Sequence, residues 1–185
     1  MALIPTKPIP LGFKAPNFAL LDTISDQILS YEDIKGTHGT LVMFICNHCP
    51  YVIHMRKTLT QLAKDYQAKG VGFVAISSND VVGYPQDGPD HMKALALAEK
   101  FPFPYLYDAD QSVAKAYDAV CTPDFDLFDA QERCIYRGQM DSTRPGSGMQ
   151  SNGEDMRNAI ELMLKDETIP AGNQRPSMGC NIKWK

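Results

Sequence analysis

One stretch of the sequence constrains the fold more than any other: an apolar run leads directly into two cysteines and then into a helical pattern. Residues 41–45 are continuously apolar, which is typical of a strand buried on both faces. After Cys49, apolar residues recur at steps of three and four, and these are Val52, Met55, Leu59, Leu62 and Tyr66. A second apolar run follows at residues 71–76. Strand, helix and strand in close succession predict a right-handed βαβ unit with parallel strands.

Both ends of the predicted helix carry local signals. Pro50 suits the first turn, where its missing N–H would have no partner anyway, and Gly70 stands where a C-terminal cap is expected. Cys46 therefore falls at the end of a buried strand, and Cys49 falls in the first turn of the helix. Free backbone N–H groups and the positive end of the helix dipole favour a thiolate at such a place.

The remaining strands are expected in two hairpins. Residues 1–17 are proline-rich and predict an extended segment along the surface. Residues 18–21 and 27–29 predict an N-terminal hairpin, and residues 124–129 and 133–138 alternate in polarity as the arms of a second hairpin do.

Three further helices are expected. One carries Met92 and ends before residue 101, and a short one follows Asp110. Ser151 and Glu154 have the spacing of a capping box, which predicts the start of a last helix. The chain has no internal repeat, so we expect one α/β domain over residues 1–185, with a C-terminal tail over residues 170–185.

Composition excludes several classes of function. The chain has 185 residues, 44% of them hydrophobic and 22% charged, as is ordinary for one globular domain. The net charge of −4 and the lack of a dense Lys/Arg run argue against a nucleic-acid partner. No stretch is apolar enough to cross a bilayer, and the start does not resemble a signal peptide. We therefore expect no membrane partner and a cytoplasmic location, where thiols stay reduced.

The five cysteines indicate chemistry or packing, because an odd number cannot be fully paired within one chain. Cys46 is the expected nucleophile, with the greater exposure and the lower pKa of the pair, and Cys49 is expected to resolve the mixed disulfide. His48, when protonated, would stabilise the Cys46 thiolate and make the disulfide a stronger oxidant. Cys121 and Cys134 are expected to be packing residues.

Two other interpretations of this segment stay open. Cys46, Cys49 and either His48 or His54 are ligand types for zinc, but a structural zinc site needs four ligands and no second paired motif is present. The other interpretation is an inert buried pair, since free cysteine packs well in cores. His54 is otherwise expected to be an exposed helix histidine. We expect neither a metal nor an organic cofactor.

Four motifs resemble those of a known family, and they occur in this order: CNHCPYV at residues 46–52, CTPDF at 121–125, YRG at 136–138 and GCNIKWK at 179–185. They resemble the peroxiredoxin-like branch of the thioredoxin superfamily, within the alkyl hydroperoxide reductase/thiol-specific antioxidant type of domain. The resemblance covers nearly the whole chain. It implies a thioredoxin fold, with a central mixed sheet flanked by helices, the N-terminal hairpin as an extension, and an insertion near residues 79–101.

The resemblance also implies that Thr122 and Pro123 form the family's cis-proline loop. This loop would face the dithiol, and the Thr122 backbone would pair with an extended substrate strand. The sequence departs from typical peroxiredoxins, which place Pro seven residues and Thr or Ser three residues before the reactive cysteine; here Gly39 and Met43 stand there. It departs from typical thioredoxins in having Ile45 in place of Trp before the dithiol.

Cys180 lies in the tail. From Ile169 to Cys180 an extended chain spans roughly 35–40 Å, at about 3.3 Å per residue, which is near the ~40 Å diameter of a compact chain of this length. The tail can therefore reach the dithiol, with Ile182 and Trp184 as anchors. Cys180 is either a third redox thiol or an inert cysteine of an ordered tail.

The sequence predicts a thiol–disulfide oxidoreductase that uses Cys46 and Cys49 in redox homeostasis or antioxidant defence. Its partners would be thiols and disulfides, of proteins or small molecules, and its electrons would come from another thiol system. One alternative is a thiol-dependent peroxidase acting on peroxides. The other is a thiol-based metal-binding module that uses Cys46, Cys49 and Cys180.

Overall fold

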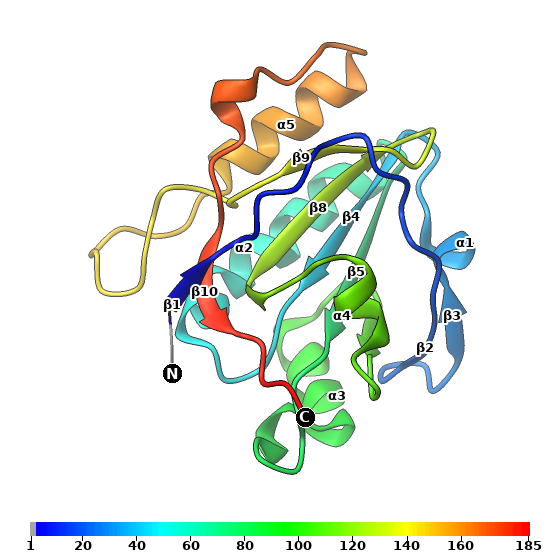
Figure 1. Ribbon diagram of the computed structural model, residues 1–185, viewed down its shortest axis with the longest axis vertical. Coiled ribbons are helices and arrows are strands. Elements are labelled where there is room, and N and C mark those ends of the chain that lie inside the picture. The colour runs from blue at the N-terminus through cyan, green and yellow to red at the C-terminus, as the bar shows by residue number, and fades with distance from the viewer. Residues whose placement is uncertain (1–2) are drawn as a thin grey trace.

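The computed structural model describes residues 3–185 and is built around a seven-stranded mixed sheet (Figure 1). The strand order is β3-β2-β6-β5-β4-β8-β9. The strands are β2 (Ala19–Asp22), β3 (Ile28–Ser30), β4 (Gly39–Phe44), β5 (Val71–Ser77), β6 (Tyr105–Tyr107), β8 (Asp124–Asp129) and β9 (Cys134–Arg137). Strand β4 is parallel to β5 and antiparallel to β8, so the sheet is mixed as expected.

Helices cover both faces of this sheet. They are α1 (Tyr31–Ile34), α2 (Pro50–Gln67), α3 (Pro89–Glu99), α4 (Ser112–Ala116) and α5 (Glu154–Leu164), with 3-10 helices at Pro85–Asp87 and Ala171–Asn173. Alternate residues of β4 enter two apolar clusters: Leu41 and Met43 pack with α2, α3 and α5, whereas Val42 and Phe44 pack with α1 and α4. A strand buried on both faces produces this division, because its side chains alternate across the sheet.

The predicted βαβ unit is confirmed. All six residues of β4 are buried, and α2 begins with Pro50 and connects β4 to the parallel β5. The helix turns its apolar stripe inward, with Val52, Leu59 and Leu62 fully buried. The sheet therefore presents the segment between β4 and α2 at the carboxyl end of a central strand.

A second, three-stranded sheet joins the two ends of the chain, which no local pattern in the sequence indicates. Its order is β1 (Leu3–Pro5), β10 (Met178–Asn181) and β7 (Cys121–Thr122), all antiparallel. Figure 1 shows β1 and β10 side by side, although they lie at opposite ends of the sequence. The extended segment expected over residues 1–17 thus contains a paired strand, and its first two residues lie outside the described part.

The start of the last helix differs from the expectation. Gly153, with a φ of 71°, is the N-cap of α5, and Ser151 lies two residues earlier. Ser151 Oγ instead donates to Asp141 Oδ2 at 2.6 Å, so the buried carboxylate competes successfully for the hydroxyl. A capping box occurs at α1, between Ser30 and Asp33. Among residues 3–185, no helix combines the length and apolar character that crossing a membrane requires.

Candidate active site

The two cysteines of the CNHC segment stand between the end of β4 and the start of α2. Cys46 lies two residues beyond the strand, and Cys49 is the N-cap of the helix, one position before the first turn where we expected it. Both side chains are buried, with exposed fractions of 1% for Cys46 and 0% for Cys49. The expected greater exposure of Cys46 is therefore wrong, because residues from the insertion and the tail close over the segment.

Each sulfur has defined neighbours on the Thr122–Pro123 loop. Cys46 Sγ lies 3.3 Å from Thr122 Oγ1, and Cys49 Sγ lies 3.0 Å from the Thr122 carbonyl oxygen. The Thr122–Pro123 peptide bond is cis, as the resemblance implies. One residue thus contacts both thiols, through its hydroxyl and its carbonyl.

The acidities of the two thiols depend on one another. The neighbouring Cys46 thiol, followed by the Cys180 thiol and the Val52 N–H, favours a thiolate at Cys49 and lowers the pKa of Cys49 to about 4 against the opposing effect of burial. Cys49, burial and the Asp87 charge raise the pKa of Cys46 above its usual range. The Thr122 carbonyl oxygen, which accepts from Cys49 Sγ at 3.0 Å, favours a protonated Cys49 instead. The pair therefore gives up one proton readily and holds the other, and these acidities belong to the pair rather than to either cysteine.

The directions of these shifts differ from the expectation that Cys46 has the lower pKa of the pair. The helix N-terminus alone favours a thiolate at either cysteine, but only Cys49 is surrounded by several S–H and N–H donors. Cys46 faces a buried carboxylate, which disfavours a second negative charge.

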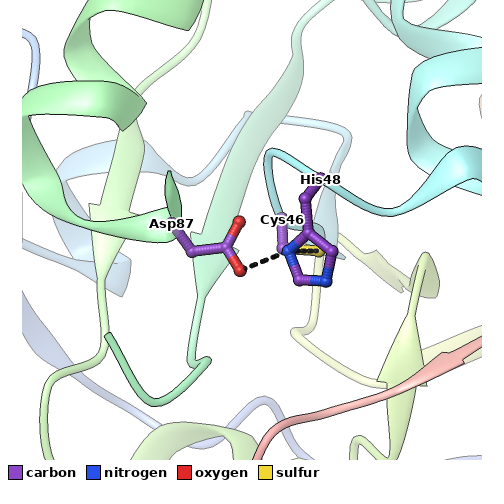
Figure 2. A group of neighbouring side chains, drawn as sticks. All are labelled: Cys46, His48 and Asp87. Carbon is purple, nitrogen blue, oxygen red and sulfur yellow. Dashed lines mark hydrogen bonds and ion pairs between the residues drawn. The ribbon is translucent and has the colours of Figure 1, made fainter. Parts of the chain in front are cut away.

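The half-buried His48 and the fully buried Asp87 form a pair beside Cys46 (Figure 2). His48 Nδ1 lies 2.7 Å from Asp87 Oδ2 and 4.0 Å from Cys46 Sγ. Asp87 is fully buried at the end of the 3-10 helix, where its carboxylate also accepts from the Asn47 N–H and from Asn79 Nδ2, each at 2.8 Å. We infer that Nδ1 carries the hydrogen that bonds Asp87, since a carboxylate only accepts. With its hydrogen directed to Asp87, Nδ1 is not available to accept a proton from Cys46.

The opposite side of the imidazole is apolar. The His48 ring stacks on Tyr84, with ring centroids 5.2 Å apart, and His48 Nε2 is buried with no hydrogen-bond partner among the described residues. Sequence reasoning missed Asp87, Asn79 and Tyr84. Only the expected insertion near residues 79–101 hinted at this region, and no spacing within it distinguishes Asp87 from a surface carboxylate.

The site offers one group of potential metal ligands. Cys46, His48 and Asp87 each present a donor atom, and these atoms lie within 4.8 Å of one another. Both oxygens of Asp87 already accept hydrogen bonds, so a cation would have to displace the His48 and Asn79 contacts. Hydrogen bonding thus accounts for the arrangement.

The tail lies where the resemblance implied that a substrate strand would pair. Strand β10 runs antiparallel to β7, with Cys180 opposite Thr122, and Cys180 Sγ lies 3.1 Å from Cys49 Sγ. Gly179 passes the cis bond so closely that a Cβ there would lie 2.1 Å from the Thr122 carbonyl oxygen. Only glycine permits this approach.

The other residues singled out in the sequence lie in ordinary packing environments. Cys121 and Cys134 are buried, and burial raises the pKa of both thiols. His54 is half-buried rather than exposed, and its Nε2 lies 2.8 Å from Thr143 Oγ1. No hydrogen bond joins His54 to either cysteine of the dithiol among the described residues.

Comparisons with known proteins agree with this architecture. A crystal structure of an uncharacterized conserved protein from Geobacillus kaustophilus is similar, with a TM-score of 0.97 and 50% identity over 100% of this chain and 97% of that chain. A hypothetical protein from Sinorhizobium meliloti has a TM-score of 0.94 and 42% identity over 98% of each chain. No curated protein matches the sequence.

More distant similarity identifies the fold. The thioredoxin domain of a thiol-disulfide oxidoreductase from Bacteroides vulgatus has a TM-score of 0.65 and 17% identity, over 85% of this chain and 99% of that domain. The fold is that of thioredoxin. The model of the AhpC/TSA family matches residues 11–140, a segment that includes the CNHC dithiol, its His48–Asp87 neighbours and the cis-proline loop. The chain therefore belongs to the AhpC/TSA family.

Proposed function

We propose that this protein is a thiol–disulfide oxidoreductase in which Cys46 attacks the substrate and Cys49 resolves the mixed disulfide. The observation that carries the proposal is the Cys46–Cys49 pair, held between the end of β4 and the start of α2 with Thr122 in contact with both sulfurs. Membership in the AhpC/TSA family supports a thiol redox function.

The acidity of the pair supports a division of labour. Cys49, as the resting thiolate, accepts the Cys46 proton as Cys46 attacks a disulfide RSSR′. A bond forms between Cys46 and SR, and R′S⁻ leaves. Cys49 then attacks Cys46 Sγ, and the RS group leaves with the Cys49 proton. The products are RSH, R′S⁻ and the Cys46–Cys49 disulfide, so two electrons pass from the dithiol to the substrate.

The surroundings suit each step. The Thr122 hydroxyl donates to the developing Cys46 thiolate and lowers its pKa. A protonated His48, oriented by Asp87, adds positive charge 4.0 Å from the same sulfur. Cys49 is enclosed by Cys46, Thr122 and Cys180, which leaves Cys46 as the sulfur that meets a substrate.

One observation favours a second candidate, a thiol-dependent peroxidase. Both sulfurs are buried, so a small oxidant reaches them with less rearrangement than a protein disulfide needs. Cys46 would attack a peroxide ROOH to give its sulfenic acid and ROH, and Cys49 would displace water to form the same disulfide. The absence of the Pro and Thr/Ser pattern at Gly39 and Met43 weighs against this activity.

A stopped-flow comparison tests the proposal. Reduced protein is mixed with hydrogen peroxide, a small disulfide or a protein disulfide, and the disappearance of each thiol is followed by mass spectrometry. We expect Cys46→Ser to slow the reaction strongly and leave only a slow reaction at Cys49, Cys49→Ser to trap a mixed disulfide on Cys46, and Cys134→Ser to behave as the unsubstituted protein. Faster oxidation by peroxide than by either disulfide would favour the peroxidase. If the purified protein contains one zinc ion per chain and this zinc blocks the reaction of Cys46, the result would favour a metal-binding module in redox or metal homeostasis.

A further inference from the structure

The C-terminal strand places a third thiol against the dithiol. Cys180 is buried, with an exposed fraction of 5%, and its Sγ lies 3.1 Å from Cys49 Sγ. The Cys180 backbone N–H also donates to Cys49. Among the described residues, Cys180 makes no contact with Cys46, so Cys49 is the sulfur that links the other two thiols.

The residues that follow Cys180 fix this position by contacts with two separate parts of the site. Ile182 is buried, and its N–H donates to the Val120 carbonyl at 2.9 Å, just before β7. The Lys183 N–H donates to Asn79 Oδ1 at 2.9 Å, and Asn79 Nδ2 donates to Asp87. Of the two expected anchors, Ile182 is buried, whereas Trp184 is 42% exposed. The tail is therefore built into the same hydrogen-bond network that orients His48.

We infer that Cys180 is a third redox-active thiol, which exchanges with the Cys46–Cys49 disulfide to form a Cys49–Cys180 disulfide. This inference rests on the proposed function, because it needs the first disulfide to form. Cys180 Sγ attacks Cys49 Sγ, the Cys46–Cys49 bond breaks, and Cys46 leaves as the thiol after taking the proton that Cys180 gives up. One disulfide is exchanged for another, so no external oxidant or reductant is required.

The direction of attack follows from the contacts. Burial raises the pKa of Cys180 to about 12, so Cys180 is protonated at rest and gives up its proton in the exchange. Cys46 gains a proton as it is released, because its pKa is also raised, so the number of protons is unchanged. Cys49 is the central sulfur, in contact with both partners.

In a simple dithiol, the cysteine that attacks the substrate is also part of the disulfide that the electron donor reduces. The exchange would assign these two functions to different cysteines. Cys46 is returned to its reduced form beside His48 and Thr122, while the oxidising equivalent remains at Cys49 and Cys180. The electron donor would then act on the Cys49–Cys180 disulfide in the tail rather than on Cys46. Strand β10 thus occupies the edge of β7 as a built-in partner strand and brings its own sulfur to Cys49.

Peptide mapping of Cys46→Ser under non-reducing conditions tests the exchange directly. This variant keeps Cys49 and Cys180, and we expect oxidised glutathione to convert it to the Cys49–Cys180 disulfide. Cys46→Ser combined with Cys180→Ser should instead retain glutathione on Cys49. In the unsubstituted protein, one equivalent of oxidant should yield both the Cys46–Cys49 and the Cys49–Cys180 disulfides.

A matched pair of glycine variants keeps every thiol and tests the position of the tail. Gly179→Ala places a Cβ against Thr122 and should lower the yield of the Cys49–Cys180 disulfide by roughly tenfold, because small displacements strongly slow reactions between positioned groups. Gly172→Ala, a tail position with no atom within 4 Å of the added Cβ, should leave the yield unchanged.

The outcomes separate this inference from the proposed function. A Cys46–Cys49 disulfide in the unsubstituted protein, together with free Cys180 there and in oxidised Cys46→Ser, overturns the third thiol and leaves the dithiol mechanism standing. Failure of the unsubstituted protein to form either disulfide overturns both. Mapping of the unsubstituted protein requires no substitution, so this test decides the inference even if a variant fails to fold.

Discussion

Asp87 binds His48 at a distance of 2.7 Å between Oδ2 and Nδ1, and so ties the loop between the two cysteines to the 3-10 helix that precedes α3. The same carboxylate accepts from the Asn47 N–H, which belongs to that loop. Asp87 thereby fixes both the backbone and the imidazole beside Cys46. The charge near Cys46 therefore depends on His48 and Asp87 together.

His48→Ala should make the dithiol more reducing. A protonated imidazole stabilises the single negative charge of the reduced Cys46–Cys49 pair, whereas the buried Asp87 carboxylate, left without its His48 partner, disfavours that charge; both changes disfavour the reduced form. Because each tenfold change in equilibrium constant corresponds to about 30 mV, we expect a shift of tens of millivolts towards more negative potential. Equilibration with glutathione measures it. His91→Ala, at an exposed position of α3, is the control, and an equal potential in both variants would contradict the role of His48.

Thr122→Val should slow the reaction of Cys46. The hydroxyl lies 3.3 Å from Cys46 Sγ and lowers its pKa, and a hydrogen bond to a charged group contributes about 1.5–3 kcal/mol. A loss of this size corresponds to a rate lower by about tenfold or more. Stopped-flow oxidation by a small disulfide measures the rate, and Thr122→Ser should restore it. Slow reaction of the serine variant would instead indicate a packing effect.

The thiolate of the reduced protein should persist well into acid. The pKa of Cys49 is lowered to about 4, so absorbance of the thiolate near 240 nm should be present at pH 6 and disappear as the pH falls through about 4. Cys46→Ala removes the main donor and should raise this midpoint. Cys134→Ala, at a buried thiol outside the site, should leave it unchanged. If the thiolate absorbance changes only near pH 8–9, the range of an ordinary thiol, the lowered pKa of Cys49 is excluded.

Asp126→Asn should change the dependence of stability on pH. Burial raises the pKa of Asp126 to about 7, despite its 2.6 Å ion pair with Arg137. The folded state therefore holds a proton that the unfolded state loses near pH 4. The contribution of Asp126 to stability falls as the pH rises from about 4 to 7, by up to about 1.4 kcal/mol per pH unit.

Asparagine does not titrate, so the Asp126→Asn variant does not lose this contribution to stability. Its free energy of unfolding should therefore rise, relative to that of the unsubstituted protein, as the pH rises from about 4 to 7. Urea unfolding at pH 4.5 and 7.5 measures the difference. Asp90→Asn, at an exposed position, serves as the control. A constant difference between the two pH values would show that Asp126 keeps an ordinary acidity in the folded protein.

The sequence by itself determined the scaffold of the site. The alternation of strand and helix around residues 41–76 is encoded in local periodicity, and Pro50 marks the helix start directly after Cys49. Such signals are local, because the pattern of buried side chains along a strand or helix is set by backbone geometry. The dithiol and its place at the end of a central strand therefore followed from the sequence, and the cis-proline loop followed from the family motifs.

Only the tertiary structure decided what surrounds the sulfurs. His48 and Asp87 are 39 positions apart, and Cys49 and Cys180 are 131 apart, so no local pattern relates them. The burial of Cys46 and the contacts of Cys49 Sγ with Thr122 and Cys180 come from distant segments. The physical reason is that burial, hydrogen-bond donors and neighbouring charges determine a thiol's acidity and access, and the folded chain brings these groups together from separate parts of the sequence.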